Sequence, residues 1–567
     1  MNENNWRQVR DGTPWTRRRF LQTATAAGAA MAIPLGRLNA QGTDEEQRIE
    51  AAVSKLVAVP GKSRRLLIFD RNVGYGGHPS ARTANQAFTR MGRTTGAFEA
   101  VVSQDPAVFA PESLRRFDAV FFNNNVGNLF TDPLLRRSLV EFVYGGGGLM
   151  GVHGTSVAFT QWPGAIEDWP EFGIMLGARG ANHRESTERV FLRVDDPTHP
   201  VVRSLPGGGF EYRDEFFRFG DPYSRRRVRV LLSIDTEKTD LDQGPARGQC
   251  LREDGDYALA WVRGYGRGRV FYCTIAHNPY VFWDPMMLQF YLAATQFILG
   301  DLPGPTTPSA FLTPAVRARE RLGWATALVP NGRSSPPATL FETIDRAAEA
   351  GLLNVGAVYG QPVRPGDAAR LDASLAPELR EAIRLKLDAA AVCLRTLRID
   401  HVPDAAADLE QLFDVARQMG AETLIVPAAA RMDPLESLCR RHDIHVALVP
   451  PDSGGTGGVS GVAELLAACA ERDQRLGVCV SPRDLRAVDA DPAQAVGWIG
   501  GRLKVLRLGR RPSARGRLNQ VLAAVAKAGM PLLIGVNDAV EPQGAAAMRE
   551  HIDRIDETCI ELADKTR

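Results

Sequence analysis

Short apolar runs alternate with amphipathic stretches along the first half of this chain. The runs at 65–70, 117–123 and 149–152 are almost continuously apolar. Runs of this length, bounded by turn residues, are typical of strands that are buried on both faces. The stretches at 83–91 and 133–143 have helical spacing instead. Strands that alternate with helices predict an α/β domain built on a doubly wound parallel sheet.

The same alternation resumes after a proline-rich stretch at 302–309 and continues to the end of the sequence. Such a stretch is typical of a semi-rigid linker. Beyond it, apolar runs separated by helical stretches lie at 322–326, 355–359, 392–395, 423–427, 445–449, 476–480, 504–508 and 531–536. Eight strand-helix units within about 250 residues predict a (β/α)8 TIM barrel.

These patterns divide the chain into four segments. We expect a signal peptide at 1–40, an α/β domain at 62–301, a Pro-rich linker at 302–320 and a TIM barrel at 321–567. A chain of 567 residues needs several domains, because single hydrophobic cores stop growing at about 250–300 residues.

Composition narrows the function classes without naming one. Apolar residues make up 44% of the chain and charged residues 24%, which is ordinary for a globular protein. A net charge of +2 and the lack of a concentrated basic stripe argue against nucleic acid as a partner. The seven cysteines form no Cys-x-x-Cys pair, so the sequence predicts neither a zinc ribbon nor a disulfide framework.

The N-terminal segment has the order of features found in export signals. Three arginines at 17–19 precede Phe20-Leu21 and a run of small residues at 23–35. We interpret this as a twin-arginine signal with cleavage after Ala40. It predicts a periplasmic or extracellular protein with no membrane attachment after cleavage. The alternative is a disordered basic tail.

The run at 149–152 is preceded by four glycines and delivers His153 onto a Gly-flanked turn. Glycine ends the preceding helix because it adopts positive φ without a steric penalty. In open α/β sheets, ligands bind at the carboxyl ends of strands. Some hydrolases present a nucleophile on such a turn. Here the presented residue is an imidazole, so acid-base chemistry is expected.

The order of motifs in this half resembles the ThuA-like (trehalose utilisation) family, whose fold is similar to class I glutamine amidotransferases. The motifs are Gly147-Gly148-Leu149-Met150-Gly151-Val152-His153, Asp168-Trp169-Pro170-Glu171-Phe172, Gly177 with His183, Asp196-Pro197-Thr198-His199-Pro200, Arg213-Asp214-Glu215-Phe216, Trp261, Gly266-Arg267-Gly268-Arg269-Val270 and His277-Asn278. In the amidotransferases a cysteine occupies the turn. Because His153 stands there, the resemblance implies no glutaminase activity, and Cys273 lies elsewhere.

Polar residues at predicted strand ends and loops supply a candidate site. His153, Glu215 and His277 are the expected catalytic residues, because imidazole and carboxylate can exchange protons near neutral pH. Substrate-binding roles fall to Asn124, Asn125, Trp169, His183 and Asp214, with Trp162 in the same region. For each histidine a structural role remains an alternative, and His199 between Thr198 and Pro200 is interpreted as a turn residue. A dinucleotide site at the Gly-rich stretch 74–78 is not expected, since it lacks the G-x-G-x-x-G pattern.

The second half resembles the xylose-isomerase-like sugar epimerase and isomerase barrels. These barrels hold a divalent metal with Glu, Asp and His at the carboxyl ends of their strands. At the matching positions this chain has Val449-Pro450-Pro451, Ser481-Pro482-Arg483-Asp484, Arg507-Leu508-Gly509-Arg510 and Gly535-Val536-Asn537. Most of these side chains cannot replace the ligands, although Asp452, Asp484 and Asp538 could be remnants. We expect the barrel to have lost its metal site.

The sequence therefore predicts an exported protein of carbohydrate metabolism whose first domain binds or transforms a sugar derivative. The partner is a small-molecule carbohydrate, and self-association stays open. A divalent metal is a candidate cofactor, but no residue is assigned as its ligand. The alternatives are a non-enzymatic carbohydrate-binding or assembly protein and, more weakly, a sugar isomerase or epimerase acting through the barrel.

Overall fold

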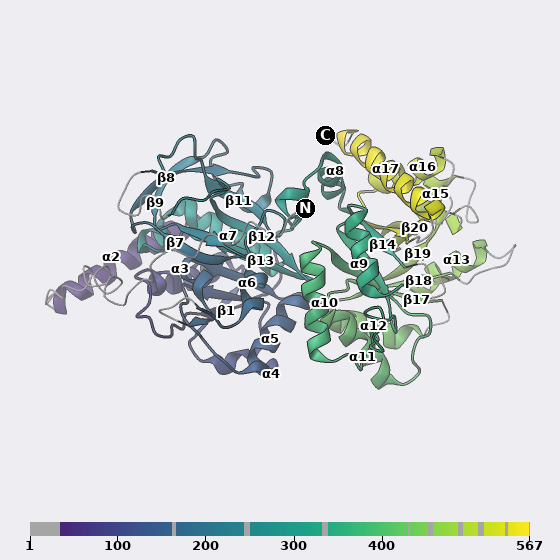
Figure 1. Ribbon diagram of the computed structural model, residues 1–567, viewed down its shortest axis with the longest axis horizontal. Coiled ribbons are helices and arrows are strands. Elements are labelled where there is room, and N and C mark those ends of the chain that lie inside the picture. The colour runs from purple at the N-terminus through teal and green to yellow at the C-terminus, as the bar shows by residue number, and fades with distance from the viewer. Residues whose placement is uncertain are drawn as a thin grey trace.

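The computed structural model describes residues 35–161, 166–242, 250–330, 338–428, 431–450, 458–482, 484–485, 491–508, 515–538 and 542–565. Within these ranges the chain forms two folded units that lie side by side along the long axis of the molecule (Figure 1). The predicted signal peptide falls mostly outside the described residues. Its last residues belong to helix α2 (Leu35–Val53). No helix among the described residues is both long enough and apolar enough to cross a membrane.

The first unit is built on a nine-stranded mixed sheet. Its parallel half has the order β2 (Glu99–Ser103), β1 (Arg65–Phe69), β3 (Ala119–Asn123), β4 (Gly148–Val152) and β13 (Gly268–Cys273). Its antiparallel half continues with β12 (Ala258–Tyr265), β11 (Arg229–Ile234), β8 (Glu188–Val194) and β9 (Phe210–Asp214). The predicted α/β sheet is confirmed, but it is parallel in one half only.

The two halves of the sheet meet at a hairpin. β12 turns into β13 through Gly266, which has a φ of +59°. A Cβ atom on Gly266 would lie 2.4 Å from the carbonyl oxygen of Tyr144. Any other residue would therefore be strained and crowded in this turn.

Both faces of the sheet are covered, as its continuously apolar strands require. Leu66 and Ile68 of β1 pack into a core with α3 (Ala81–Thr95) and α7 (Pro285–Leu299). Leu67 and Phe69 point to the opposite core, which includes α5 (Pro133–Tyr144) and α6 (Pro170–Leu176). Shorter pieces complete the unit: α4 (Pro111–Leu114), β5 (Thr160–Gln161), β6 (Ile166–Glu167), β7 (Arg179–His183), β10 (Phe217–Gly220) and the 3-10 turns η2 (His153–Val157), η3 (Pro200–Val202) and η4 (Pro279–Trp283).

The second unit is a closed barrel of eight parallel strands, which confirms the predicted TIM barrel. The strands are β14 (Trp324–Val329), β15 (Asn354–Val358), β16 (Cys393–Arg398), β17 (Thr423–Pro427), β18 (His445–Val449), β19 (Leu476–Val480), β20 (Leu503–Leu508) and β21 (Leu532–Asn537). The helices around them are α9 (Leu340–Glu349), α10 (Pro377–Ala389), α11 (Ala406–Gln418), α12 (Met432–His442), α13 (Gly458–Cys469), α15 (Pro492–Ile499), α16 (Arg515–Lys527) and α17 (Pro542–Lys565). Four consecutive strands, β17 to β20, each contribute one residue to a small apolar cluster: Ile425, Ala447, Cys479 and Val505.

The segment between the units is shorter than the expected linker at 302–320. Residues 314–322 form helix α8 (Pro314–Leu322), which packs against α17 of the barrel. Thr313 caps α8, and Gly323 ends it with a φ of +71°. A cavity of about 520 Å³ lies between the units and is lined by arginines of both, including Arg269 and Arg395.

Candidate functional site

His153 occupies a bend at the carboxyl end of β4. It follows Val152, begins η2 and has a φ of +41°, which is unusual for a residue with a side chain. The side chain is fully buried, and its Nδ1 lies 2.9 Å from the Thr274 carbonyl oxygen. The backbone oxygen of His153 accepts a hydrogen bond from the Tyr272 hydroxyl at 2.7 Å. The bend is thus fixed from both sides, as the sequence predicts for a residue presented at a sheet edge.

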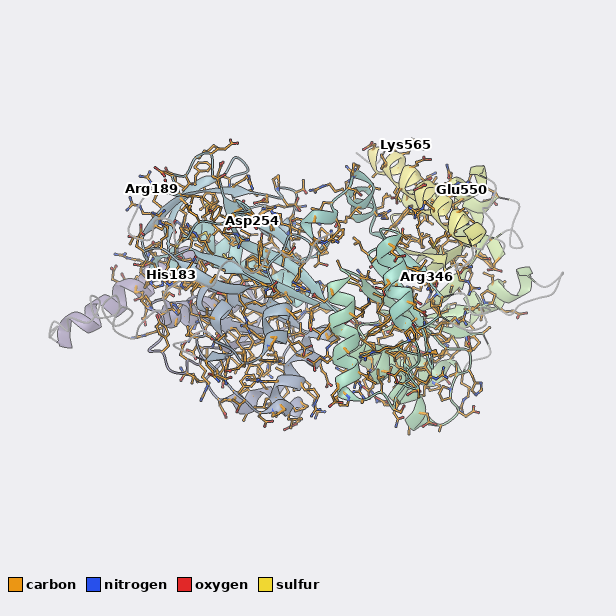
Figure 2. All side chains as sticks on the ribbon, viewed as in Figure 1. His183, Arg189, Asp254, Arg346, Glu550 and Lys565 are labelled. Atoms are coloured by element: carbon orange, nitrogen blue, oxygen red, sulfur yellow. The ribbon has the colours of Figure 1, made fainter. Side chains whose placement is uncertain are left out.

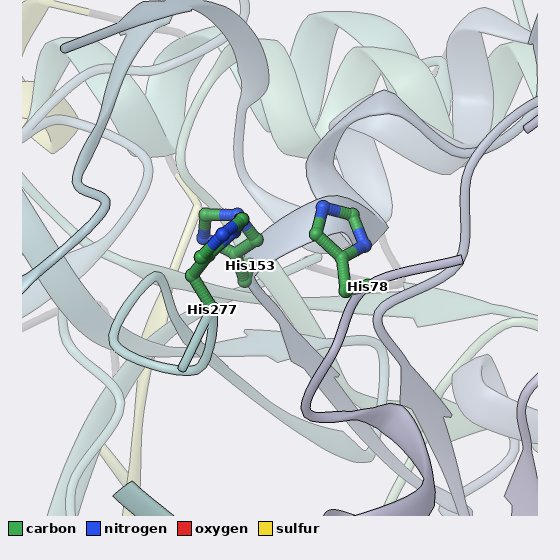
Figure 3. Close-up of side chains that lie close together, drawn as sticks. All are labelled: His78, His153 and His277. Atoms are coloured by element: carbon green, nitrogen blue, oxygen red, sulfur yellow. The ribbon is translucent and has the colours of Figure 1, made fainter. Parts of the chain in front are cut away.

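Two more histidines converge on His153 from the same edge of the sheet (Figure 3). His277 follows β13, the parallel neighbour of β4, and its Nδ1 lies 3.3 Å from His153 Nε2. His78 follows β1, and its ring centroid lies 4.8 Å from that of His153 and 5.5 Å from that of His277. In the described part of the chain, these three histidines are the group of potential metal ligands whose donor atoms all lie within 4.8 Å of one another.

Glu215 joins the histidines through both oxygens of its carboxylate. Oε1 lies 3.3 Å from His153 Nε2 and 3.3 Å from His277 Nδ1. Oε2 lies 3.3 Å from Nδ1 of His183 at the end of β7. The predicted catalytic residues His153, Glu215 and His277 are therefore brought together, and His183 adjoins them.

Asp214 supports the site from behind rather than facing into it. Its carboxylate accepts hydrogen bonds from the backbone amides of His277 and Asn278, at 3.0 and 3.1 Å, and from the Asn278 side chain at 2.7 Å. The two neighbouring acids bind different parts of one loop. Asp214 holds its backbone and Glu215 contacts its imidazole.

His78 is the member of the cluster that the sequence analysis did not identify. The Gly-rich stretch that contains it, 74–78, lacks the G-x-G-x-x-G motif of a dinucleotide site. The available signal was its position, since it follows the first predicted strand, whose carboxyl end shares an edge with that of β4. Gly154 makes the contact feasible, because a Cβ atom there would lie 2.5 Å from His78 Cε1.

The other predicted substrate-binding residues lie around the site with different surroundings. The side-chain amide of Asn124 donates to Ser80 Oγ and to the Ala276 carbonyl oxygen, both at 3.1 Å. The side-chain amide of Asn125 donates to the carbonyl oxygens of Phe69 and Arg71.

Trp169 packs among aromatic rings of the core. Among the described residues its ring contacts those of Phe130, Phe159 and Phe172, and no histidine ring. Trp162 lies outside the described residues.

Burial and neighbouring side chains shift the pKa values of His277, His78 and Glu215. Burial lowers the pKa of His277 to about 4, with the charge of His153 acting in the same direction. It also lowers the pKa of His78 well below its ordinary value. Burial would raise the pKa of Glu215, but the neighbouring imidazoles of His153 and His183 hold it below its usual range. Near neutral pH, a carboxylate therefore faces neutral imidazoles of His78 and His277.

Exposure to solvent differs among the residues of the cluster, and His183, labelled in Figure 2, is the most exposed of the histidines around Glu215. The His183 side chain is 43% exposed and that of His277 15%, whereas that of His153 is fully buried. The exposed fraction of the side chain therefore falls from His183 to His277 to His153.

The carboxyl ends of the barrel strands offer no comparable cluster within the described residues. The Asp484 carboxylate accepts hydrogen bonds from the backbone amide and the hydroxyl of Ser481, so it stabilises its own turn. Asp538 is paired with Arg346 of α9, labelled in Figure 2. The described residues there line a cavity of only about 20 Å³. Pro451, Asp452, Arg483, Gly509 and Arg510, also considered above, lie outside the described residues.

Comparison with known families gives a match over the first unit. Residues 65–298 match the family model described as ThuA, trehalose utilisation. The ThuA-like domain thus contains the whole histidine cluster. No curated protein matches the chain.

Solved structures similar to parts of the chain fall into two groups. A ThuA-like protein from Bacteroides uniformis is 20% identical, with a TM-score of 0.36, over 42% of this chain and 94% of its own. A D-tagatose 3-epimerase-like protein is 13% identical, with a TM-score of 0.31, over 43% of this chain and all of its own. An L-ribulose 3-epimerase is 10% identical, with a TM-score of 0.31, over 43% of this chain and 97% of its own.

Proposed function

We propose that this chain is an exported protein of carbohydrate metabolism whose ThuA-like domain binds and transforms a sugar derivative. The observation that carries the proposal is the convergence of His153, His277 and Glu215 at the carboxyl edge of the parallel strands. Ligands of open α/β sheets bind at that edge. The family description, trehalose utilisation, supports a sugar as the ligand class.

The chemistry that fits these groups is proton transfer on an oxidised or glycosidic sugar. Burial lowers the pKa of His277 to about 4, so its imidazole is neutral at pH 7 and keeps one ring nitrogen with a free lone pair. Glu215 keeps its charge and contacts three imidazoles, which positions them and stabilises a transient imidazolium. His153 is held by the Thr274 carbonyl with its Nε2 facing the same point.

The barrel has a non-catalytic role in this proposal. Asp484 and Asp538 are engaged in local contacts, and the cavity between the described strand ends has room for about one water molecule. Export by the twin-arginine route rests on the arginines at 17–19 and the small residues after them.

The test is conversion of a panel of disaccharides and keto-sugars, followed by NMR, with the wild type and Glu215→Gln. We expect the variant to lose at least about 100-fold in kcat/KM, because a positioned acid or base contributes roughly 10²–10⁴-fold. Glu211→Gln is the matched control, since Glu211 lies on β9 with an exposed side chain paired to Arg189.

Two results would contradict the proposal. One is a wild-type protein that neither binds nor converts any sugar of the panel. The other is sugar conversion that proceeds equally well in Glu215→Gln and in Glu211→Gln, which would place the reaction elsewhere. Binding without conversion would support the non-enzymatic alternative.

A further inference from the structure

We infer that His78, His153, His277 and Glu215 form a binding site for one divalent transition-metal ion, with Zn²⁺ as the best match. The three histidines follow β1, β4 and β13, which lie in the same parallel half of the sheet. Their donor atoms gather within 4.8 Å of one another, although the residues are far apart in the sequence. The inference concerns the site of the proposed function but does not depend on the ligand being a sugar.

The hydrogen bonds leave lone pairs pointing at one another. A carbonyl oxygen can only accept, so the Nδ1 of His153 beside the Thr274 carbonyl carries the proton, and Nε2 is unprotonated in the neutral ring. The same holds for His78, whose Nδ1 lies 3.2 Å from the Asn124 carbonyl. Backbone carbonyls that fix the far nitrogen of an imidazole in this way are typical partners of metal-binding histidines.

Two acceptors, His153 Nε2 and Glu215 Oε1, then face one nitrogen of His277. His153 Nε2, His277 Nδ1 and Glu215 Oε1 lie at the corners of a triangle whose three sides are each 3.3 Å. A single proton on His277 can serve only part of this triangle and leaves other lone pairs facing each other. A cation at its centre satisfies all three.

The triangle also has the dimensions of a metal site. Zinc bonds to imidazole nitrogen and carboxylate oxygen are about 2.0–2.2 Å, which places tetrahedral ligands about 3.3–3.5 Å apart. The three sides of 3.3 Å match that spacing. His78 is the fourth donor, and its ring has to move toward the other three to complete the coordination.

The donor set selects the kind of ion. Imidazoles with one carboxylate suit Zn²⁺ and its transition-metal neighbours, whereas Mg²⁺ and Ca²⁺ prefer oxygen ligands. Among the described residues, the group of converging donor atoms contains histidines and no cysteine. His183 contacts the outer oxygen of Glu215 and the Arg184 carbonyl, so it orients the carboxylate.

The test measures metal binding by the full-length protein in the absence of any sugar. Metal-free protein is titrated with Zn²⁺ against a chromophoric chelator, and Co²⁺ is added separately to record its visible spectrum. The variant is His277→Asn, since His277 is partly exposed and its removal spares the buried bend. The control is His445→Asn at the exposed start of β18. Circular dichroism verifies that both variants fold.

We expect about one Zn²⁺ per chain, and the intense Co²⁺ absorption of a tetrahedral site, in the wild type and in His445→Asn. His277→Asn should bind at least about 100-fold more weakly, since loss of an outer hydrogen-bond partner alone costs about 10–100-fold. Absence of binding by the wild type, or equal affinity in His277→Asn, overturns the inference. A protein that binds Zn²⁺ here but no sugar contradicts only the proposed function, and one that converts sugar but binds no metal contradicts only this inference.

Discussion

His199 is held in one neutral tautomer by two backbone contacts. Its Nδ1 accepts a hydrogen bond from the backbone amide of Val201 in η3, at 3.3 Å, and its Nε2 lies 3.1 Å from the Pro305 carbonyl oxygen. The turn role that the sequence suggested for this residue agrees with these contacts. Burial, reinforced by the charge of Arg229, lowers the pKa of His199 to about 4. Protonation would put a second N–H against the amide of Val201.

This arrangement predicts a loss of stability in acid. A histidine in the unfolded chain has a pKa of about 6.5, whereas the pKa of His199 in the folded chain is about 4. The unfolded state therefore binds more protons in that window, and stability falls as the pH drops from about 6.5 to about 4. His199→Asn retains a capping oxygen but does not titrate. Between pH 7 and 4.5 the wild type should lose about 2–3 kcal/mol more than the variant in urea unfolding. Parallel losses in both proteins would exclude His199 as the cause.

At the residue scale, the sequence predicted the contributors to the site better than their exact roles. His153, Glu215 and His277 could be nominated because each follows a recognisable motif. His78 could not be predicted, because a lone histidine in a glycine-rich loop gives no sign of its partners. Only the fold brings its ring next to that of His153. Trp169 was nominated for a sugar face, but the depth of its aromatic neighbours can be seen only in three dimensions.

At the scale of elements, the bend after β4 depends on a glycine that lets two loops approach closely. A Cβ atom on Gly154 would lie 2.5 Å from His78 Cε1 and 3.1 Å from the Asn124 carbonyl oxygen. Gly76 lies in the loop that carries His78, and a Cβ atom added to Gly76 would have no neighbouring atom within 4 Å. The two glycines thus form a matched pair for substitution by alanine.

We expect Gly154→Ala to displace the His78 ring and weaken Zn²⁺ binding roughly tenfold, which corresponds to about 1.4 kcal/mol. Overpacking should also cost about 1–3 kcal/mol of stability. Gly76→Ala should keep both wild-type affinity and melting temperature. Chelator competition and thermal unfolding measure the two quantities. Equal affinities for the two variants would show that the His78 position is not set by this contact.

The strands that the sequence did not reveal share a physical reason. β2 lies at the edge of the sheet and β8 alternates buried and exposed residues, so neither forms a continuous apolar run. The central strands β1, β3 and β4 are buried on both faces and were placed within a residue or two. Antiparallel pairing of β11 with β12 depends on partners that an apolar run does not specify.

At the scale of the whole molecule, buried charged residues join the two units, and their pairing across the junction could not be predicted from the sequence. The carboxylate of Glu171 in the ThuA-like domain accepts hydrogen bonds from Arg384 of α10 at 3.0 Å and from the Tyr265 hydroxyl at 2.8 Å. The carboxylate of Asp388 in α10 forms salt bridges with Arg263 at 2.5 Å and with Arg227 at 2.9 Å. Figure 1 shows α10 at the junction between the units. A proline-rich connection suggested only a spacer, whereas these pairs fix one domain against the other.

Asp388→Asn should uncouple the two units. Removing the carboxylate leaves the guanidinium groups of Arg227 and Arg263 without a charged partner in a mostly buried interface, and breaking such a pair costs about 3–5 kcal/mol. The matched control is Asp345→Asn. Asp345 lies on α9 and forms a more exposed salt bridge with Lys386 of α10. Exposed salt bridges contribute at most about 1 kcal/mol to stability. In differential scanning calorimetry we expect one main transition for the wild type and for Asp345→Asn. We expect two separated transitions for Asp388→Asn, since each unit has its own core. A single unshifted transition in Asp388→Asn would mean that the interface does not couple the unfolding of the two domains.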